Sequence, residues 1–502
     1  MLGGLAVDAE LLGKLYEEGT EFDRIFYKLC RLDNLYIFKI NRELEEKIPP
    51  MLYSDLTKIL FKKIKLGKAC DIYQLTVEHL RYCGESVLLK ILEFINRILE
   101  NMYYLSCSQL KLGIASAIHK GKRKPLDLST SYRRITVTPI LGVIIDYYLD
   151  PMAEALFRPR QSPDQVGFTA GISYLIAAIQ RGECQRWAID KKITCFGISL
   201  DSEATFPSVE RDILLRELYS VGERGDLLQY SRCTYENTMC HLKLGSKLSR
   251  PVEEFKGTRQ GHVRASGHFK AYLDPCLHSL SASQLGFRIG LLCITAVCDA
   301  DDMYILSDSQ SGLQGALNIT AHHALRYHQR FNACKTRAVV VGSKIDMAYF
   351  EDICPWTLYG KKLSVVETNE HLGLLVSGLN EEQKHVDNNI TKCRNSLFGL
   401  LGPAFAYKCL LNPIVQTHIW RTCLLPVLIS GLPALPIRPV QIKALTIFHN
   451  KILRGFLKLS RFAPITALHF LLGELPVEGV LHCRTLGLLH NLQKIQILLY
   501  MP

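Results

Sequence analysis

The tripeptide Ala300-Asp301-Asp302 lies between two short apolar segments, and this arrangement constrains the fold more than any other feature of the chain. The segment before it, 293–298 (CITAVC), is β-branched and apolar, and the segment after it, 303–306 (MYIL), is apolar again. Aspartate is a frequent turn residue between strands of this kind. We therefore predict a β-hairpin, with strands over these two segments, that carries its acidic side chains at the bend.

A further aspartate, Asp201, ends a second strand-like segment, 193–200 (ITCFGISL). We expect Pro207 to close this strand and Ser208 to cap a helix over 211–219 (RDILLRELY). Strands that end at the same edge of a sheet bring their terminal side chains together. The buried stripe of the helix is predicted to contain Ile213, Leu214 and Leu218.

Asp201, Asp301 and Asp302 could together hold two divalent ions. Two ions about 3.5–4 Å apart are the usual machinery of nucleotidyl transfer, and Mg²⁺ prefers hard oxygen ligands. Most acidic triplets are solvated turns, however, so the tripeptide alone leaves both interpretations open.

The composition is that of a globular, basic protein. The chain has 502 residues, 48% of them hydrophobic, and 60 Lys plus Arg against 48 Asp plus Glu give a net charge of +12. This balance favours a polyanionic partner. The 17 cysteines form no CxxC pair, and with no secretory signal at the amino terminus they are expected to be reduced thiols. No apolar run is long enough for a membrane span.

Seven stretches in one order resemble the reverse transcriptase of non-LTR (LINE-like) retrotransposons. Each stretch is weak alone, but their common order from about residue 120 to about residue 380 is specific. The stretches are KRKPLDLSTSYRRITVTP (122–139), QSPDQVGF (161–168), SLDSEATFPSV (199–209), GTRQGHVRASGHFKAYLDP (257–275), CDADDMYILS (298–307), FNACKTRAVVVGS (331–343) and EHLGLLVSG (370–378).

The resemblance implies an α+β fold, the right-hand polymerase, with fingers, a palm built on an antiparallel sheet, and a helical thumb. We predict a helical N-terminal extension over residues 1–120 and fingers and palm over 121–345. The palm–thumb junction, the helical thumb and the C-terminal region are predicted over 346–502, with a hairpin that turns at Gly360.

The implied activity is that of an RNA-directed DNA polymerase, in which a primer 3′-hydroxyl attacks the α-phosphate of a deoxynucleoside triphosphate. The implied partners are an RNA template, a DNA primer and dNTPs, without a membrane, and the implied cofactor is a pair of Mg²⁺ ions that Mn²⁺ could replace. The expected location is the nucleus or cytoplasm, in a ribonucleoprotein.

The resemblance also assigns catalytic roles. Asp201, Asp301 and Asp302 match the metal ligands, and Lys335 matches a lysine that donates a proton to the departing pyrophosphate. An ordinary surface lysine is the alternative for Lys335.

Five further residues match substrate-binding positions. Phe206 would stack under the sugar and exclude a ribose 2′-hydroxyl, and Gln260 and Gly261 would contact the nascent base pair. Arg133 and Lys124 would pair with the triphosphate. The alternatives are a core aromatic for Phe206 and a solvated basic turn for Arg133 and Lys124.

The chain departs from the family pattern at several positions. Pro207 replaces an acid, Asp299 replaces the usual Tyr or Phe before the acidic pair, Ala265-Ser266 replaces Ser-Pro, and Arg134 replaces a proline. These departures keep open a catalytically inactive, nucleic-acid-binding copy from a decayed element. An unrelated two-metal phosphotransferase or nuclease is a third possibility, but it leaves the other motifs without a role.

Overall fold

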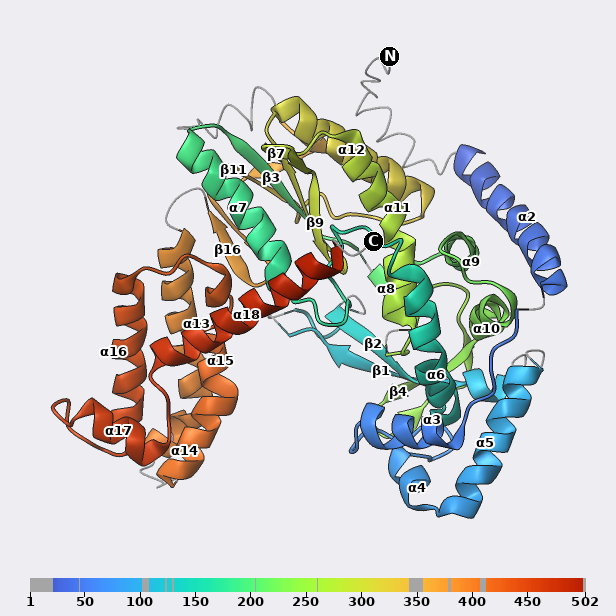
Figure 1. The fold of residues 1–502 in the computed structure, drawn as a ribbon, viewed down its shortest axis with the longest axis horizontal. Coiled ribbons are helices and arrows are strands. Elements are labelled where there is room, and N and C mark those ends of the chain that lie inside the picture. The colour runs from blue at the N-terminus through green and yellow to red at the C-terminus, as the bar shows by residue number, and fades with distance from the viewer. Residues whose placement is uncertain are drawn as a thin grey trace.

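A central sheet with helices on both faces is flanked by two helical lobes (Figure 1). The structure is a computed structural model, and it describes residues 21–44, 46–101, 108–121, 124–128, 131–203, 205–259, 261–342, 355–377, 381–406 and 412–499.

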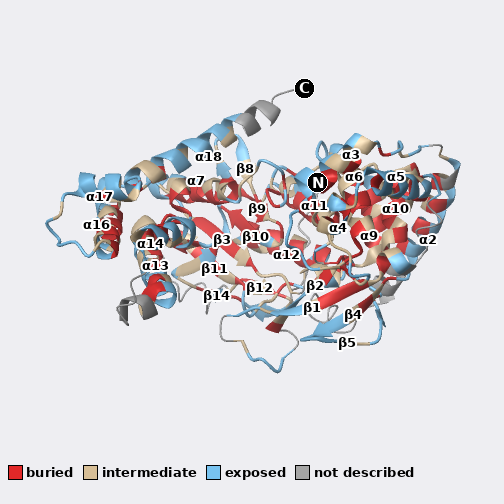
Figure 2. Ribbon diagram, turned by 90° about the horizontal axis from the view of Figure 1, so that it is seen from below, coloured by how far each residue is buried: buried red, intermediate tan, exposed pale blue. Residues whose placement is uncertain are grey.

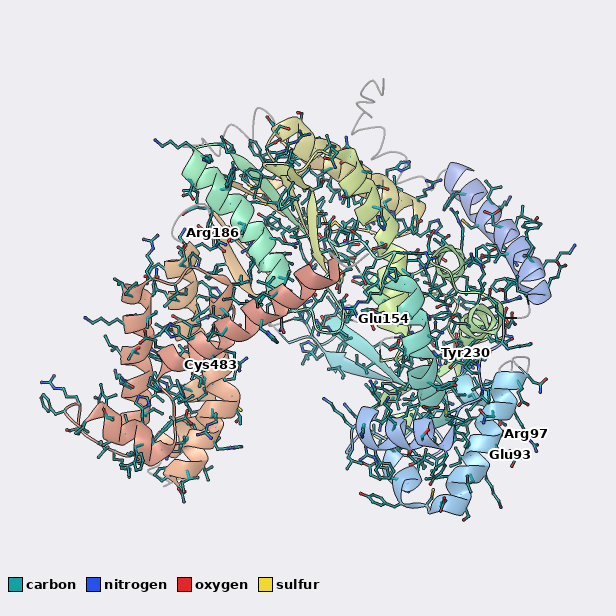
Figure 3. The ribbon with its side chains drawn as sticks, viewed as in Figure 1. Glu93, Arg97, Glu154, Arg186, Tyr230 and Cys483 are labelled. Carbon is teal, nitrogen blue, oxygen red and sulfur yellow. The ribbon has the colours of Figure 1, made fainter. Side chains whose placement is uncertain are left out.

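The N-terminal helices after residue 50 share a hydrophobic core with α6 (Ile140–Phe157), whereas α2 packs its buried residues Phe26, Cys30 and Phe38 into the core that contains α9 (Arg211–Ser220). Leu56, Leu60 and Ile95 are fully buried in this core, on the apolar faces of their helices. Glu93 and Arg97 form an exposed ion pair on the outer face of α5 (Figure 3). The elements are α2 (Glu21–Glu43), α3 (Tyr53–Lys58), η1 (Ile59–Lys63), α4 (Val77–Tyr82), α5 (Glu85–Glu100) and η3 (Ser108–Lys111).

The fingers sheet follows. β1 (Gly113–His119) lies between β2 (Tyr132–Val137), with which it is antiparallel, and β4 (Met239–Leu244), with which it is parallel. The short strands β5 (Lys247–Leu248) and β6 (Val252–Glu253) both pair with β4. Because β1 precedes residue 121, the predicted helical region 1–120 also contains a strand.

The palm sheet has the strand order β14-β11-β3-β10-β9. β3 lies antiparallel to both β10 and β11, while β11 and β14 are parallel. The strands are β3 (Cys195–Leu200), β9 (Ala296–Asp299), β10 (Asp302–Ser307), β11 (Arg337–Val341) and β14 (Ser364–Val365).

Successive side chains of β10 point to opposite faces of the sheet, so the core of the palm has two layers. Met303 and Ile305 pack with α9 (Arg211–Ser220), α11 (Ala265–Ser283) and α12 (Gln310–Arg326), whereas Tyr304 and Leu306 pack with α7 (Leu175–Lys191). These strands are buried between the helices (Figure 2). The remaining palm elements are α8 (Thr205–Ser208), α10 (Gly225–Tyr235), β7 (Phe287–Ile289), β8 (Leu292–Ile294), β12 (Thr357–Leu358), β13 (Lys361–Lys362), β15 (Thr368–His371) and β16 (Leu374–Ser377).

The C-terminal region is a helical lobe with its own hydrophobic core. Its last helix, α18 (Val477–Leu499), begins in that core at Val477 and reaches the palm core at Leu488, so it spans both parts (Figure 1). The other elements are α13 (Glu381–Ala406), α14 (Pro413–Ile419), η6 (Trp420–Leu424), α15 (Leu425–Leu428), η7 (Leu432–Ala434), α16 (Pro439–Phe456) and α17 (Ile465–Leu472).

A buried ion pair joins the palm to this lobe. Arg181 on α7 has a fully buried side chain and contacts Glu381, the first residue of α13, at 2.8 Å. The Arg181 guanidinium also lies over the Tyr304 ring, 5.9 Å from its centroid. Breaking a buried pair leaves an uncompensated charge, so the first turn of α13 is held firmly against the palm.

Several local predictions are confirmed and two are wrong. The helix over 211–219 is α9, and Gly360 turns the β12–β13 hairpin. Ser208 does not cap α9, because it lies in α8 and Glu210 occupies the cap position. The segment 293–298 is not one strand: its first part belongs to β8, which pairs with β7, and only its second part forms β9. The predicted boundary at 345/346 lies outside the described residues.

In the described part of the chain, every cysteine is a free thiol. No helix there has the length and apolar character that a membrane crossing requires.

Replacing Gly197 with alanine tests the packing between β3 and β10. A Cβ at Gly197 would lie 2.6 and 2.7 Å from Cε1 and Cζ of Tyr304, which is buried. We expect Gly197→Ala to cost about 1–3 kcal/mol through overpacking. Gly267→Ala is the control, because a Cβ there meets nothing within 4 Å. Chemical denaturation measures both, and equal stability of the two variants would contradict this account.

Candidate active site

The predicted acidic hairpin is present as β9–β10. Asp302 pairs with Asp299 and Met303 pairs with Cys298, so the turn consists of Ala300 and Asp301. Ala300 has a left-handed backbone with φ of 62°, which is uncommon for a residue with a side chain. Asp301 and Asp302 therefore lie at the tight turn that joins β9, the edge strand, to β10.

The pairing of β3 with β10 brings Asp201 to the same place. Met303 is opposite Leu200, so Asp302 and Asp201 face each other one residue further along the two strands. Lys335 donates to Asp201, with Nζ 2.9 Å from Oδ2. A turn at Asn332 holds this lysine: the Asn332 amide donates to the Asp201 carbonyl at 2.8 Å, and the Lys335 amide donates to the Asn332 carbonyl at 3.0 Å.

Asp301 has a different partner. The Thr205 hydroxyl donates to its Oδ2 at 2.6 Å, from the first residue of α8. The next residue, Phe206, packs its ring against Phe269 and Phe168, with centroids 5.3 and 6.3 Å away. Phe206 is only partly buried, so its ring lies at the margin of the palm core, one residue after the threonine that binds Asp301.

Crowding of the four acids has an electrostatic cost. Loss of water around the hairpin, followed by repulsion from Asp301, Asp299 and Asp201, raises the pKa of Asp302 to about 6. Burial, and then repulsion from Asp301, also raises the pKa of Asp299. Asp302 itself remains exposed, so a cation from solvent can reach it.

Basic residues of the fingers face this acidic cluster. The pKa of Lys120 is lowered by loss of water and then by repulsion from Lys124, Arg133 and Lys335, while Asp201 opposes the shift. Arg133 lies exposed on β2 and Lys124 lies in the loop before it. The predicted residues Lys124, Arg133, Lys335 and Asp201 therefore belong to one electrostatic neighbourhood, together with Lys120.

The glycine of the Gln-Gly motif lies against the fingers sheet. Gly261 has a φ of 110°, and a Cβ on it would lie 2.9 Å from the Thr136 carbonyl of β2. Gln260 lies outside the described residues. The preceding Thr258 amide donates to the Phe206 carbonyl at 2.9 Å, which ties this loop to α8.

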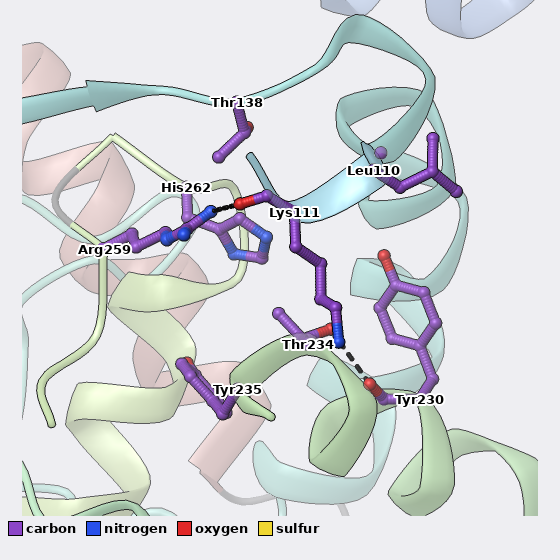
Figure 4. Close-up of a pocket in the computed structure, with 9 residues that line it drawn as sticks. Leu110, Lys111, Thr138, Tyr230, Thr234, Tyr235, Arg259 and His262 are labelled. Atoms are coloured by element: carbon purple, nitrogen blue, oxygen red, sulfur yellow. Dashed lines mark hydrogen bonds between the residues drawn. The ribbon is translucent and has the colours of Figure 1, made fainter. Parts of the chain in front are cut away.

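A buried polar network anchors the same loop. Arg259 donates to Glu254 at 2.7 Å and to the carbonyl groups of Met239 and Lys111, so it links the loop to β4 and η3. Figure 4 shows the contact between Arg259 and Lys111. Buried Asp146 contacts both His262 and Tyr230 at 2.7 Å. These contacts enclose a small cavity, of about 30 Å³, that is separate from the acidic turn.

The chemistry of the acids suits a divalent cation, although the side chains are not closed around one. Among the described residues, no three His, Cys, Asp or Glu side chains form a group that could hold a metal as they stand. Asp201 contacts Lys335 and Asp301 contacts Thr205, so their oxygens are engaged. The donors are hard carboxylate oxygens, and their mutual repulsion is the interaction that a bound cation relieves.

The role of Thr205 was not predicted from the sequence. Thr205 lies within the first catalytic motif, next to Phe206, but a threonine there carries no signal that it will reach Asp301.

The strand order, the acids at the ends of β3 and β10, and the helical lobes define a right-hand polymerase. Residues 118–376 match the family described as "Reverse transcriptase (RNA-dependent DNA polymerase)", which is more than half of the chain. The protein belongs to the reverse transcriptase family, and the predicted resemblance is confirmed.

One curated relative supports the non-LTR type. It is the "Retrovirus-related Pol polyprotein from type-1 retrotransposable element R2" of Nasonia vitripennis, 29% identical over 119 residues. The matched part covers 24% of this chain and 12% of that relative, so the chain spans a small share of its length.

Two solved telomerase structures overlay loosely. One is apo telomerase from Candida tropicalis truncated from the C-terminal domain, with a TM-score of 0.39 and 12% identity, covering 54% of each chain. The other is telomerase from Candida albicans in complex with a TWJ fragment of telomeric RNA, with a TM-score of 0.41 and 12% identity, covering 72% of this chain and 61% of that one.

The raised pKa of Asp302 predicts how stability depends on pH without divalent cations. The folded chain binds a proton at Asp302 more tightly than the unfolded chain does, with a pKa of about 6 against 3.8. The free energy of unfolding should therefore fall as the pH rises from 3.8 to about 6. Denaturation in EDTA across this range measures the slope, and Asp302→Asn should flatten it. An unchanged slope would show that Asp302 does not carry this cost.

Proposed function

We propose that this protein is an RNA-directed DNA polymerase that transfers nucleotides from dNTPs to a primer 3′-hydroxyl on an RNA template. The observation that carries the proposal is the meeting of Asp201, at the end of β3, with Asp301 and Asp302 on the β9–β10 turn, inside a reverse transcriptase domain. The basic residues of the fingers beside this cluster suit a triphosphate.

The side chains of this chain have distinct roles in the proposed reaction. The fingers residues Lys124 and Arg133 bind phosphate oxygens of the incoming nucleotide. Lys335 moves from Asp201 to the leaving pyrophosphate and gives it a proton. Thr205 orients the Asp301 carboxylate through its 2.6 Å hydrogen bond. Phe206 borders the sugar, and Gly261 lets the backbone approach the nascent base pair.

Asp201, Asp301 and Asp302 would hold the divalent ions, for which Mg²⁺ is the expected species and Mn²⁺ a substitute. Ions held by these carboxylates would supply the chemistry that lowers the pKa of the primer hydroxyl and neutralises charge on the phosphates. Lys335, which now contacts Asp201, would rearrange around such ions. Lys335 is exposed and free to do so.

Asp299 favours a second candidate, a catalytically inactive protein that keeps the fold and binds nucleic acid. It places a carboxylate directly opposite Asp302, where the family carries an aromatic residue. Such a protein would bind template–primer with or without Mg²⁺ and would not extend the primer.

Replacing Asp301 with asparagine separates the two candidates. The polymerase proposal predicts extension of a DNA primer on an RNA template by the wild type, and loss of at least about a hundredfold in rate for Asp301→Asn. Single-nucleotide extension with Mg²⁺ and dNTPs is the measurement. Asp308→Asn is the matched control, because Asp308 is exposed beyond the far end of β10 and should leave the rate unchanged. Template–primer binding without extension by the wild type would establish the inactive alternative.

Phe206→Val tests whether this ring selects the sugar. If Phe206 excludes a 2′-hydroxyl, the preference for dNTPs over ribonucleotides, measured as the ratio of kcat/KM values, should fall about tenfold or more. A variant that loses stability while the ratio is unchanged would show that Phe206 is only a core aromatic.

A further inference from the structure

The segment 164–167, which belongs to no helix or strand, extends the palm sheet beyond its edge. The Val166 amide donates to the Cys298 carbonyl at 2.8 Å, and the Cys298 amide donates to the Asp164 carbonyl at 2.8 Å. Gln165 and Cys298 form a parallel bridge. β9 therefore has a partner on its outer side, next to the turn that carries the acids.

The Gln165 side chain continues this pairing where backbone pairing stops. Its Oε1 accepts the Ala300 amide at 2.9 Å, and its Nε2 donates to the Ala300 carbonyl at 3.1 Å. The same Oε1 accepts the Gly167 amide at 2.9 Å. Gln165 is only 2% exposed, so water does not compete for these bonds.

The turn needs such support. Ala300 has a φ of 62°, which disfavours a residue with a Cβ. Gly167 allows the close approach, since a Cβ there would lie 2.7 Å from the Ala300 Cα and 2.8 Å from the Asp299 carbonyl carbon.

The Ala300 carbonyl also accepts the Cys298 thiol at 3.2 Å, whereas the Ala300 amide donates to Gln165. A single side chain that binds both backbone groups must accept from the amide and donate to the carbonyl. A primary amide donates and accepts at once, whereas an ionised carboxylate only accepts and an ammonium only donates. The simplest alternative is a buried glutamine that merely satisfies its own hydrogen bonds. A glutamine with only that role could bond to any polar groups nearby. It would not need to bond twice to Ala300, the left-handed residue that precedes Asp301 and Asp302.

We propose that Gln165 is a positioning residue that clamps both backbone groups of Ala300, holds the turn in its left-handed conformation and thereby aims Asp301 and Asp302. The clamp itself follows from the contacts above, and its effect on catalysis rests on the proposed function. The experiment therefore has one readout that needs no activity and one that does.

Hydrogen exchange at the Ala300 amide tests the clamp directly. In the wild type this amide should exchange slowly, although it lies at a turn, because its acceptor is buried. In Gln165→Met, which keeps the length of the side chain but neither bond, exchange should be about tenfold faster or more. Fast exchange in the wild type would overturn the clamp without any variant, so the test holds even if Gln165→Met does not fold.

Gln161→Met is the matched control for both readouts. Gln161 lies in the same loop and donates to the Gln165 carbonyl at 2.6 Å and to Thr169 at 3.1 Å, without touching the hairpin. Its variant should leave exchange at Ala300 and kcat near wild-type values. Equal acceleration of exchange in both variants would show general loosening of the loop and would overturn the specific role of Gln165.

Primer extension tests the effect on catalysis. Gln165→Met should lower kcat by about tenfold to a hundredfold through misplaced acids, with the KM for dNTP little changed. Adding Ala300→Gly, which removes the penalty of the left-handed turn, should recover part of kcat. Equal primer extension by the wild type and Gln165→Met would overturn the positioning role. If the wild type does not extend primers at all, that result counts against the proposed function, and the exchange measurement alone decides the clamp.

Discussion

Repulsion between carboxylates at one edge of the palm sheet is the constraint around which this structure is arranged. Asp201, Asp299, Asp301 and Asp302 meet where β3, β9 and β10 end. Without a cation, loss of water and then this repulsion raise the pKa of Asp302. A lysine salt-bridges one acid, a threonine hydroxyl binds another, and the basic fingers lie opposite. Each of these contacts opposes the repulsion, and each comes from a different motif of the chain.

Acidic side chains stay close together only where the backbone that carries them is rigid. Buried layers on both faces of β10 provide this rigidity, because Met303 and Tyr304 pack into separate cores. The buried Arg181–Glu381 pair, beside Tyr304, connects the same strand to the first helix of the C-terminal lobe. Close packing transmits displacements, so the placement of that lobe and the geometry of the turn are mechanically related.

The sequence alone predicts the features of the site that depend on local chemistry. Acids between apolar strands identify the turn, and the motif order identifies Asp201 and Lys335 as its neighbours. Ser208 was misassigned because a cap signal cannot reveal that α8 intervenes before the next helix. The contacts of Thr205 and Gln165 were not predicted because their partners lie 96 and 135 residues away in sequence. A one-residue change of strand register would point these side chains elsewhere.

Asp299 shows how a departure from the family pattern changes the balance at this turn. Like charges directly opposite one another across two strands are unfavourable, and Asp299 is paired with Asp302. The residue therefore weakens the hairpin in the absence of cations and deepens the negative potential that attracts them. The chain keeps every predicted metal ligand beside it, and Gln165 and Gly167 enclose the turn from the outer side. A hairpin that is held this firmly can tolerate one more charge than a free hairpin, and so Asp299 by itself does not make the site unfit for a metal.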